Sequence, residues 1–246
     1  MLVVTVQFVG SGDAFGSGGR FQACISVRAE GTHILLDCGA TSLVAMRRFG
    51  VDPASVDAVV VSHLHGDHFG GLPFLVLDAQ FSRRERPLVV AGPPGLRDRV
   101  LDAMEVFFPG SSKTERRFEL RFVELPERIE TAIGAITMTG YEVAHASGAP
   151  AYALRLACDG KVIAYSGDCE WSEALVEAAR CADLFICEAH TFDKAIKNHL
   201  AYATLQEHRT RLDCRRIVLT HMGPDMLSHR AEASEETAED GLVVSL

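Results

Sequence analysis

The sequence predicts an α/β chain of the α+β kind, in which two β-rich halves form two sheets that pack face to face with helices outside. Both halves contain several short apolar runs rich in β-branched residues, and segments with helical spacing lie between these runs. The 246 residues fit one sizeable domain, and no linker interrupts them. We therefore expect a single domain over residues 1–246.

The first half starts with strands and then alternates strands with helices. Strands are expected over 3–9, 23–29 and 33–37, with a tight turn at 30–32 between the last two. Thr41 or Ser42 caps the next helix, which stops at Gly50. The remaining elements, in order, are a strand over 57–61, a helix over 69–80, a strand over 87–91 and a helix ending near 108.

The second half repeats this style. Its hairpin over 151–166 turns through Cys158-Asp159-Gly160, because Asp-Gly suits a turn with positive φ. The other elements are strands over 118–123 and 135–143, a helix over 172–180, a strand over 184–187, a helix over 200–211, and strands over 217–220 and 241–246.

A cluster of metal-ligand residues directly follows the predicted strand over 57–61. The segment HLHGDH at 63–68 carries three imidazoles and a carboxylate, and these groups are ligands of zinc and similar divalent ions. In extended backbone, His63 and His65 point the same way, so one ion can take both. Asp67 and His68 fall in the following turn and are free to face a second ion. The segment predicts a metal site.

Three further strands deliver a residue of the same type at their C-terminal ends. His145 follows the first of them, Asp168 follows VIAYSG, and His221 follows IVLT. Open sheets place their sites at the edge where strands end. The repetition of strand and then ligand predicts that these residues complete the site.

The order of these residues resembles the metallo-β-lactamase superfamily over nearly the whole chain. Within it, SHLHGDHFGGL at 62–72 is most similar to ribonuclease Z and related phosphodiesterases, as are FVGSGDA at 8–14 and LDCG at 36–39. The resemblance implies a four-layer αββα sandwich, a metal-dependent hydrolase and a homodimer. It also implies two divalent ions, for which Zn²⁺ is expected and Mn²⁺ or Fe are alternatives.

The resemblance assigns the ligand-type residues to two ions that share a bridge. The first ion is held by His63, His65 and His145, the second by Asp67, His68 and His221, and both by Asp168. Two such ions can share a bridging hydroxide and stabilise both oxygens of a displacement at phosphorus. Asp67 is also placed to accept a proton from the attacking water.

The resemblance further implies a proton donor for the leaving alkoxide. Ribonuclease Z-like enzymes carry a Glu after a buried strand and a His at a helix start, and Glu188 and His199 match those positions. His190 is an alternative acid, and His199 could instead be a polar residue at a helix N-terminus. Asp37 either orients a ligand imidazole or caps a turn.

The chain also departs from the ribonuclease Z pattern. Only 22 residues lie between His145 and Asp168, so the Gly/Pro-rich arm that ribonuclease Z inserts there to grip transfer RNA has no room. The net charge of −9 argues against an extended nucleic-acid-binding surface. We expect a small anionic substrate or a short phosphodiester, RNA-derived ones included.

Other readings of the site remain open. The same fold could serve an acyl hydrolase acting on a thioester, a lactone or a β-lactam-like bond, or a di-iron redox or sensing protein. Glu188 with His199 favours phosphodiester chemistry. The glycine-rich loop at 10–19 is either a flexible edge of the site or a phosphate cradle.

Composition indicates the compartment. The sequence has no signal peptide and no apolar run long enough to span a membrane, and its seven cysteines contain no Cys-x-x-Cys pair. We therefore expect a cytoplasmic protein without membrane contact. Core positions are expected for Cys24, Cys158, Cys181 and Cys187, packing beside the site for Cys38 and Cys169, and surface positions for His33, His208 and His229.

Overall fold

Two seven-stranded sheets form the centre of the computed structural model, which describes residues 3–29 and 31–246. Met1, Leu2 and Glu30, the last of which belongs to the expected turn at 30–32, lie outside the described residues. The first sheet has the order β14-β1-β2-β3-β4-β5-β6 and the second the order β13-β12-β11-β10-β9-β8-β7. Each half of the chain therefore supplies most of one sheet.

The strands have the following bounds. The first sheet consists of β1 (Thr5–Gly10), β2 (Cys24–Ala29), β3 (Thr32–Leu36), β4 (Ala58–Val60), β5 (Leu88–Gly92), β6 (Leu120–Glu124) and β14 (Val243–Ser245). The second consists of β7 (Thr131–Ile133), β8 (Ile136–Val143), β9 (Ala151–Cys158), β10 (Lys161–Tyr165), β11 (Leu184–Glu188), β12 (Ile217–Thr220) and β13 (Glu236–Thr237).

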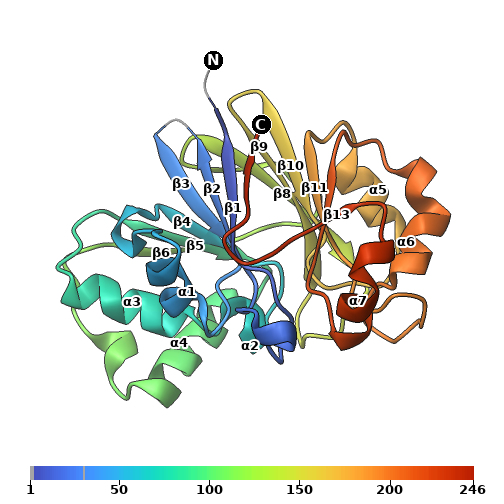
Figure 1. Cartoon of the computed structure of the whole chain (residues 1–246). Helices are drawn as coiled ribbons and strands as arrows, with labels where there is room; N and C mark the ends of the chain where they lie inside the picture. Colours follow the sequence, from blue (N-terminus) through green and yellow to red (C-terminus); the bar gives the residue numbers. More distant parts are fainter. Residues whose placement is uncertain (1–2, 30) are drawn as a thin grey trace.

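Helices cover the outer face of each sheet (Figure 1). They are α1 (Ser42–Arg48), α2 (Gly66–Phe69), α3 (Leu72–Phe81), α4 (Leu96–Phe107), α5 (Glu173–Ala179), α6 (Tyr202–His208) and α7 (Pro224–His229). One apolar cluster lies between the sheets, where Phe8 and Val60 of the first meet Leu154 and Ile186 of the second. Two other clusters lie between each sheet and its own helices. The layers confirm the αββα sandwich.

The strand directions bring four strand ends to one edge. β3, β4, β5 and β6 are parallel, and so are β10, β11 and β12. β8 pairs antiparallel with β9, which pairs antiparallel with β10, so β8 and β10 run the same way. The segments after β8, β10 and β12 therefore leave the second sheet on the same side. The segment after β4 of the first sheet lies there too, because His63 lies beside Asp168 and His145.

Most predicted elements agree with the structure to within a few residues, and several details differ. The hairpin turn has left-handed φ values of 47° at Asp159 and 73° at Gly160, as Asp-Gly predicts. Segment 66–69, expected as a turn, is the short helix α2. The prediction omitted β7, β13 and α7, which have two to six residues and weak apolar periodicity.

Two predictions of burial were wrong. His33 is buried because its ring lies between Ser26 Oγ at 2.8 Å and Ser55 Oγ at 2.9 Å. Cys181 is exposed, and its Sγ lies 3.1 Å from a carboxylate oxygen of Asp213. No helix in the described part of the chain is long and apolar enough to cross a membrane.

Candidate metal centre

Asp168 lies between two groups of imidazoles, and each of its carboxylate oxygens faces a different group. Oδ2 is 3.8 Å from His63 Nε2 and 3.9 Å from His145 Nε2. Oδ1 is 3.2 Å from His68 Nε2 and 3.4 Å from His221 Nε2. A carboxylate has two oxygens that can serve two cations at once, so this arrangement fits a bridging ligand.

The first group consists of His63, His65 and His145. Their ligand atoms lie within 4.8 Å of one another, and His65 Nδ1 is 3.0 Å from His145 Nε2. His63 and His65 come from the extended segment after β4, and His145 follows β8. His145 Nδ1 lies 2.7 Å from the carbonyl oxygen of Asn198, to which it can donate, so Nε2 is left for the site.

The second group joins Asp67, His68 and His221 to Asp168, again with ligand atoms within 4.8 Å of one another. Asp67 Oδ2 is 3.3 Å from both His68 Nε2 and His221 Nε2. Asp67 and His68 belong to α2. His221 follows β12 with a left-handed φ of 55°, and its amide donates to the carbonyl of Ser11 in the glycine-rich loop.

Several buried polar atoms at the centre make no well-aligned hydrogen bond within residues 3–29 and 31–246, although some of them lie close to one another. They include His63 Nε2, His68 Nε2 and Asp168 Oδ1. Leaving a buried polar atom unpaired costs roughly 1–3 kcal/mol, so native proteins rarely do so. All three atoms face the space between the two groups, where a divalent cation would satisfy them. The residues therefore fit a divalent metal site.

Asp37 contacts the second group on the side away from the centre, through His68 Nδ1. Its Oδ2 is 2.6 Å from His68 Nδ1 and accepts hydrogen bonds from Tyr165 Oη and Ser62 Oγ, while Oδ1 accepts from the Ser62 amide. Asp37 is fully buried. Of the two roles considered for Asp37, the structure shows the one that orients an imidazole, because its contact with Nδ1 leaves His68 Nε2 for the centre.

Charges at the centre are strongly coupled. Burial and the neighbouring His68 hold the pKa of His63 well below its usual value. Burial opposes charge on His221, but Asp168, Asp67 and Glu188 raise its pKa to about 10. Burial likewise opposes charge on Asp168, yet His221 and His68 hold its pKa well below the ordinary range. Without a metal, the carboxylates are thus kept ionised by positive charge on His68 and His221, and a divalent cation would take the place of that charge.

Glu188 and His199 form an ion pair beside the centre. Glu188 Oε1 is 2.5 Å from His199 Nδ1, and Oε2 accepts hydrogen bonds from the amides of Cys169 and Leu200. Burial disfavours charge on His199, but the hydrogen bond to Glu188 raises its pKa. His199 precedes α6 rather than starting it, because Ala201 is the N-cap.

His190 lies against His199, with ring centroids 4.5 Å apart and an interplanar angle of 24°. Its pKa is lowered by burial and by the neighbouring His199. Because the pKa of His199 is raised and that of His190 is lowered, His199 is the better placed of the two to carry a proton near neutral pH.

Sequence reasoning did not identify two groups that shape the centre. Asn198 adopts a left-handed φ of 69° that directs its carbonyl toward His145. The only sequence signal for this conformation is the residue type, because Asn tolerates positive φ better than most residues. Gly39 allows the chain to pass close to α2, because a Cβ there would lie 2.2 Å from the carbonyl oxygen of Asp67. The LDCG segment included this glycine, but the sequence did not show that close packing against α2 requires it.

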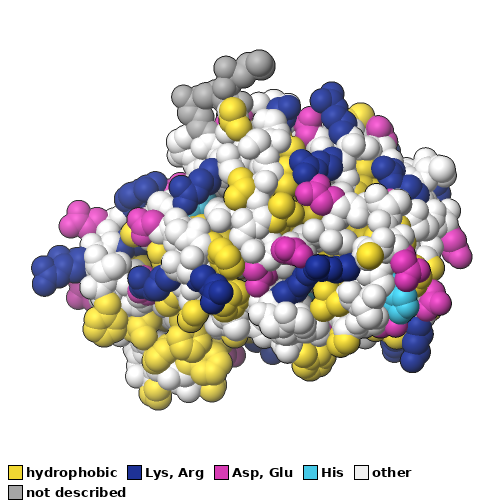
Figure 2. Space-filling model, viewed as in Figure 1, with side chains coloured by type: hydrophobic (Ala, Val, Ile, Leu, Met, Phe, Trp, Pro, Cys, Tyr) yellow, Lys and Arg dark blue, Asp and Glu magenta, His cyan; other side chains and the backbone are white. Residues whose placement is uncertain are grey.

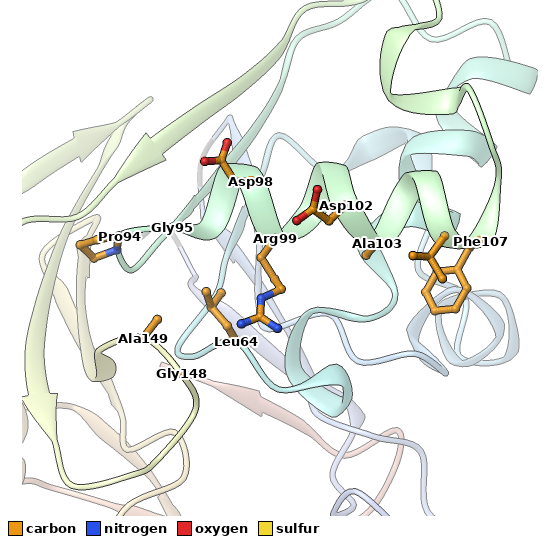
Figure 3. Close-up of a pocket in the computed structure, with 11 residues that line it drawn as sticks. Leu64, Pro94, Gly95, Asp98, Arg99, Asp102, Ala103, Phe107, Gly148 and Ala149 are labelled. Carbon is orange, nitrogen blue, oxygen red and sulfur yellow. The ribbon is translucent and has the colours of Figure 1, made fainter.

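Two cavities lie beside the centre. The larger, of about 540 Å³, lies between α4 and the segments of Leu64 and Gly148, and Arg99 projects into it (Figure 3). The smaller, of about 220 Å³, is lined by His199 and by Trp171. The large cavity is thus next to the first group, and the small one is next to the Glu188–His199 pair.

Comparison with known proteins decides the family. The family model described as anti-Pycsar protein Apyc1 matches residues 4–243. The chain belongs to the Apyc1 family. A ribonuclease Z of Lachnoclostridium phytofermentans is similar to this Apyc1-family chain, with 26% identity over 96% of this chain and 93% of its own.

Solved structures show the same fold for this Apyc1-family chain. The metallo-β-lactamase fold protein YhfI of Bacillus subtilis matches with a TM-score of 0.81 and 19% identity over 100% of both chains. The short form of human tRNase Z matches with a TM-score of 0.79 and 24% identity over 98% of both. These structures show the metallo-β-lactamase fold, and the similarity of the sequence to ribonuclease Z shows that the chain is a hydrolytic enzyme.

Proposed function

We propose that this chain is a dinuclear zinc phosphodiesterase that acts on a small or short phosphodiester. The observation that carries the proposal is Asp168, whose two oxygens face two separate imidazole groups with unpaired buried nitrogens. Five imidazoles and two carboxylates surround the centre, and such ligands suit zinc. His63, His65 and His145 would hold one ion, Asp67, His68 and His221 the other, and Asp168 both.

When bound, the two cations supply positive charge that activates a water and stabilises negative charge at phosphorus. Asp67 accepts the proton of the attacking water. His199 donates a proton to the leaving oxygen, and Glu188 holds the imidazole by Nδ1 so that Nε2 faces the substrate. The new P–O bond forms from the water, and the leaving oxygen departs with its electron pair and this proton.

The size and charge of the chain support a small substrate. The segment between His145 and Asp168 is the compact β9–β10 hairpin, and the net charge is −9. On the face shown in Figure 2, basic side chains are interspersed with acidic ones. We propose that the substrate binds at the centre itself, without an extended nucleic-acid surface.

The test is a parallel screen of the zinc-loaded protein on bis(p-nitrophenyl) phosphate, p-nitrophenyl acetate and a precursor transfer RNA. We expect turnover of the phosphodiester that falls at least 10²-fold in Asp67→Ala and His68→Ala. Turnover of the acetate alone would support the acyl-hydrolase alternative. Cleavage of the RNA with a higher kcat/KM than the small diester would contradict the proposed substrate size.

A further inference from the structure

A cavity of about 220 Å³ opens beside His199, between the loop after Asp168 and the segment that leads into α6. Its walls are mostly apolar. They are formed by Trp171, Ala195, Ile196, Leu200 and Ala201, with Glu170 and Thr204 as the polar neighbours. The cavity has the size and the walls of a site for one ring-sized apolar group.

His199 connects this cavity to the reaction. Its Nδ1 is engaged by Glu188 Oε1 and lies 3.9 Å from Asp168 Oδ2. The other ring nitrogen, Nε2, is therefore the atom free to donate. The side chain is 23% exposed and lines the cavity. A leaving group that contacts the His199 ring would therefore have this space beside it.

The aromatic wall is held rigidly. Trp171 stacks on His208 with ring centroids 4.3 Å apart and an interplanar angle of 10°, and the guanidinium of Arg211 lies 6.0 Å from its ring centroid. The neighbouring Glu170 accepts a hydrogen bond from the Asn198 amide at 2.8 Å and donates its own amide to the carbonyl of Ala144. These bonds tie the loop to the backbone that positions His145.

We propose that this cavity is the leaving-group subsite and that it binds a planar aromatic or apolar group attached to the departing oxygen. Trp171 sets this specificity by contact with the ring, which a pre-ordered aromatic side chain provides at low entropic cost. The inference rests on the proposed phosphodiesterase function, since it names which half of the diester the cavity takes. The large cavity under α4 is the competing place for the ring.

Kinetics on two diesters separate the two cavities. Methyl p-nitrophenyl phosphate and bis(p-nitrophenyl) phosphate share a leaving group and differ in the other ester group. We expect Trp171→Ala to lower kcat/KM on both by the same factor, about fivefold to tenfold, and Trp171→Phe to restore most of it. Phe107→Ala, the matched aromatic truncation at the large cavity, should leave the methyl diester unaffected. A loss confined to the bis-diester, or no loss in Trp171→Ala, overturns the inference.

Binding can be measured apart from turnover, because Trp171 is the single tryptophan of the chain. We expect p-nitrophenol to quench its fluorescence saturably, after correction against N-acetyltryptophanamide, and Ile196→Asp to weaken this binding. Saturable quenching without any phosphodiester turnover would show that the cavity binds an aromatic ring, but it would contradict the proposed function and with it the leaving-group role. Turnover without saturable quenching overturns the subsite and leaves the proposed function standing.

Discussion

At the scale of single residues, the contact of His199 Nδ1 with Glu188 leaves Nε2 as the nitrogen that would serve the proposed proton transfer to a leaving group. A basic leaving group needs a proton in the transition state, whereas p-nitrophenolate does not. We expect His199→Ala to lower kcat on diphenyl phosphate, whose leaving group is the basic phenolate, by roughly 10²-fold or more. On bis(p-nitrophenyl) phosphate, the loss should be less than tenfold. Steady-state kinetics of the zinc-loaded variants measure both.

His190→Ala serves as the comparison for this prediction, because His190 stacks on His199 but has a lowered pKa. It should produce a small loss that is similar on both substrates. If His199→Ala loses the same factor on both diesters, or if His190→Ala shows the leaving-group dependence instead, His199 is not the acid.

His33 gives a prediction about stability. Burial, helped by the nearby Arg28, lowers its pKa to about 4 in the folded chain, from 6.5 for an unperturbed imidazole. The folded state therefore binds fewer protons than the unfolded state between these pH values, and stability falls as the pH falls below 6.5. His33 should contribute a loss of about 2 kcal/mol in the free energy of unfolding between pH 7 and pH 5.

Urea denaturation at the two pH values measures this loss. The control is His33→Asn, whose amide can take the Nδ1 contact with Ser55 but does not titrate. The wild-type protein should lose more stability on acidification than the variant does. Equal losses in both proteins would show that His33 does not titrate with folding.

At the scale of elements, the loop after β3 and the start of α3 touch through two glycines. A Cβ at Gly71 would lie 2.3 Å from the carbonyl oxygen of Gly39, whereas a Cβ at Gly66 would have no atom within 4 Å. We expect Gly71→Ala to lower the free energy of unfolding by about 1–3 kcal/mol, because backbone must move. Gly66→Ala, inside α2, should be neutral or stabilising by about 0.4–1 kcal/mol. Chemical denaturation measures the free energy of unfolding of both variants. Equal changes in the two would contradict the close packing of Gly71 against Gly39.

The strand ends show how much of the site the sequence could predict. His63, Asp168 and His221 each come just after an apolar strand in the sequence. A local pattern, an apolar run followed by a ligand-type residue, therefore located them. The carbonyl of Asn198 and the ring of Trp171 come from loops whose positions depend on packing between distant segments. His145 and Asn198 are separated by 53 positions in the sequence, and the segment between them carries no periodic signal of this contact.

The same limit explains the misplaced elements. Segment 66–69 forms α2 because its amides and carbonyls pair locally around the ligand residues, although Gly66 disfavours a helix. The burial of His33 depends on a hydrogen bond to Ser55, which is 22 residues away in the short helical turn before β4. Pattern and family resemblance together predicted the layers and the ligand-type residues, whereas tertiary contacts decided these details.

At the scale of the whole molecule, the centre joins the two sheets. His63, His65, Asp67 and His68 follow β4 of the first sheet, whereas His145, Asp168 and His221 follow strands of the second. Metal bound between them would therefore cross-link both halves of the chain. Free zinc at about 1,000 times its Kd would stabilise the folded state by about 4 kcal/mol.

A chelator should consequently lower the thermal midpoint by roughly 8–16 °C for a chain of this size, and zinc should restore it. Differential scanning calorimetry measures the shift, with Asp168→Ala as the variant expected to respond less. A midpoint that is the same with and without chelator would contradict a metal link between the sheets.

The most direct test of the proposed dinuclear centre is the metal content of the protein. It is measured by mass spectrometry after purification without added metal, and again after zinc loading and desalting. We expect about two zinc ions per chain in the wild-type protein and fewer in Asp168→Ala, because one carboxylate faces both groups. One ion or none per zinc-loaded wild-type chain would contradict the proposed dinuclear zinc phosphodiesterase.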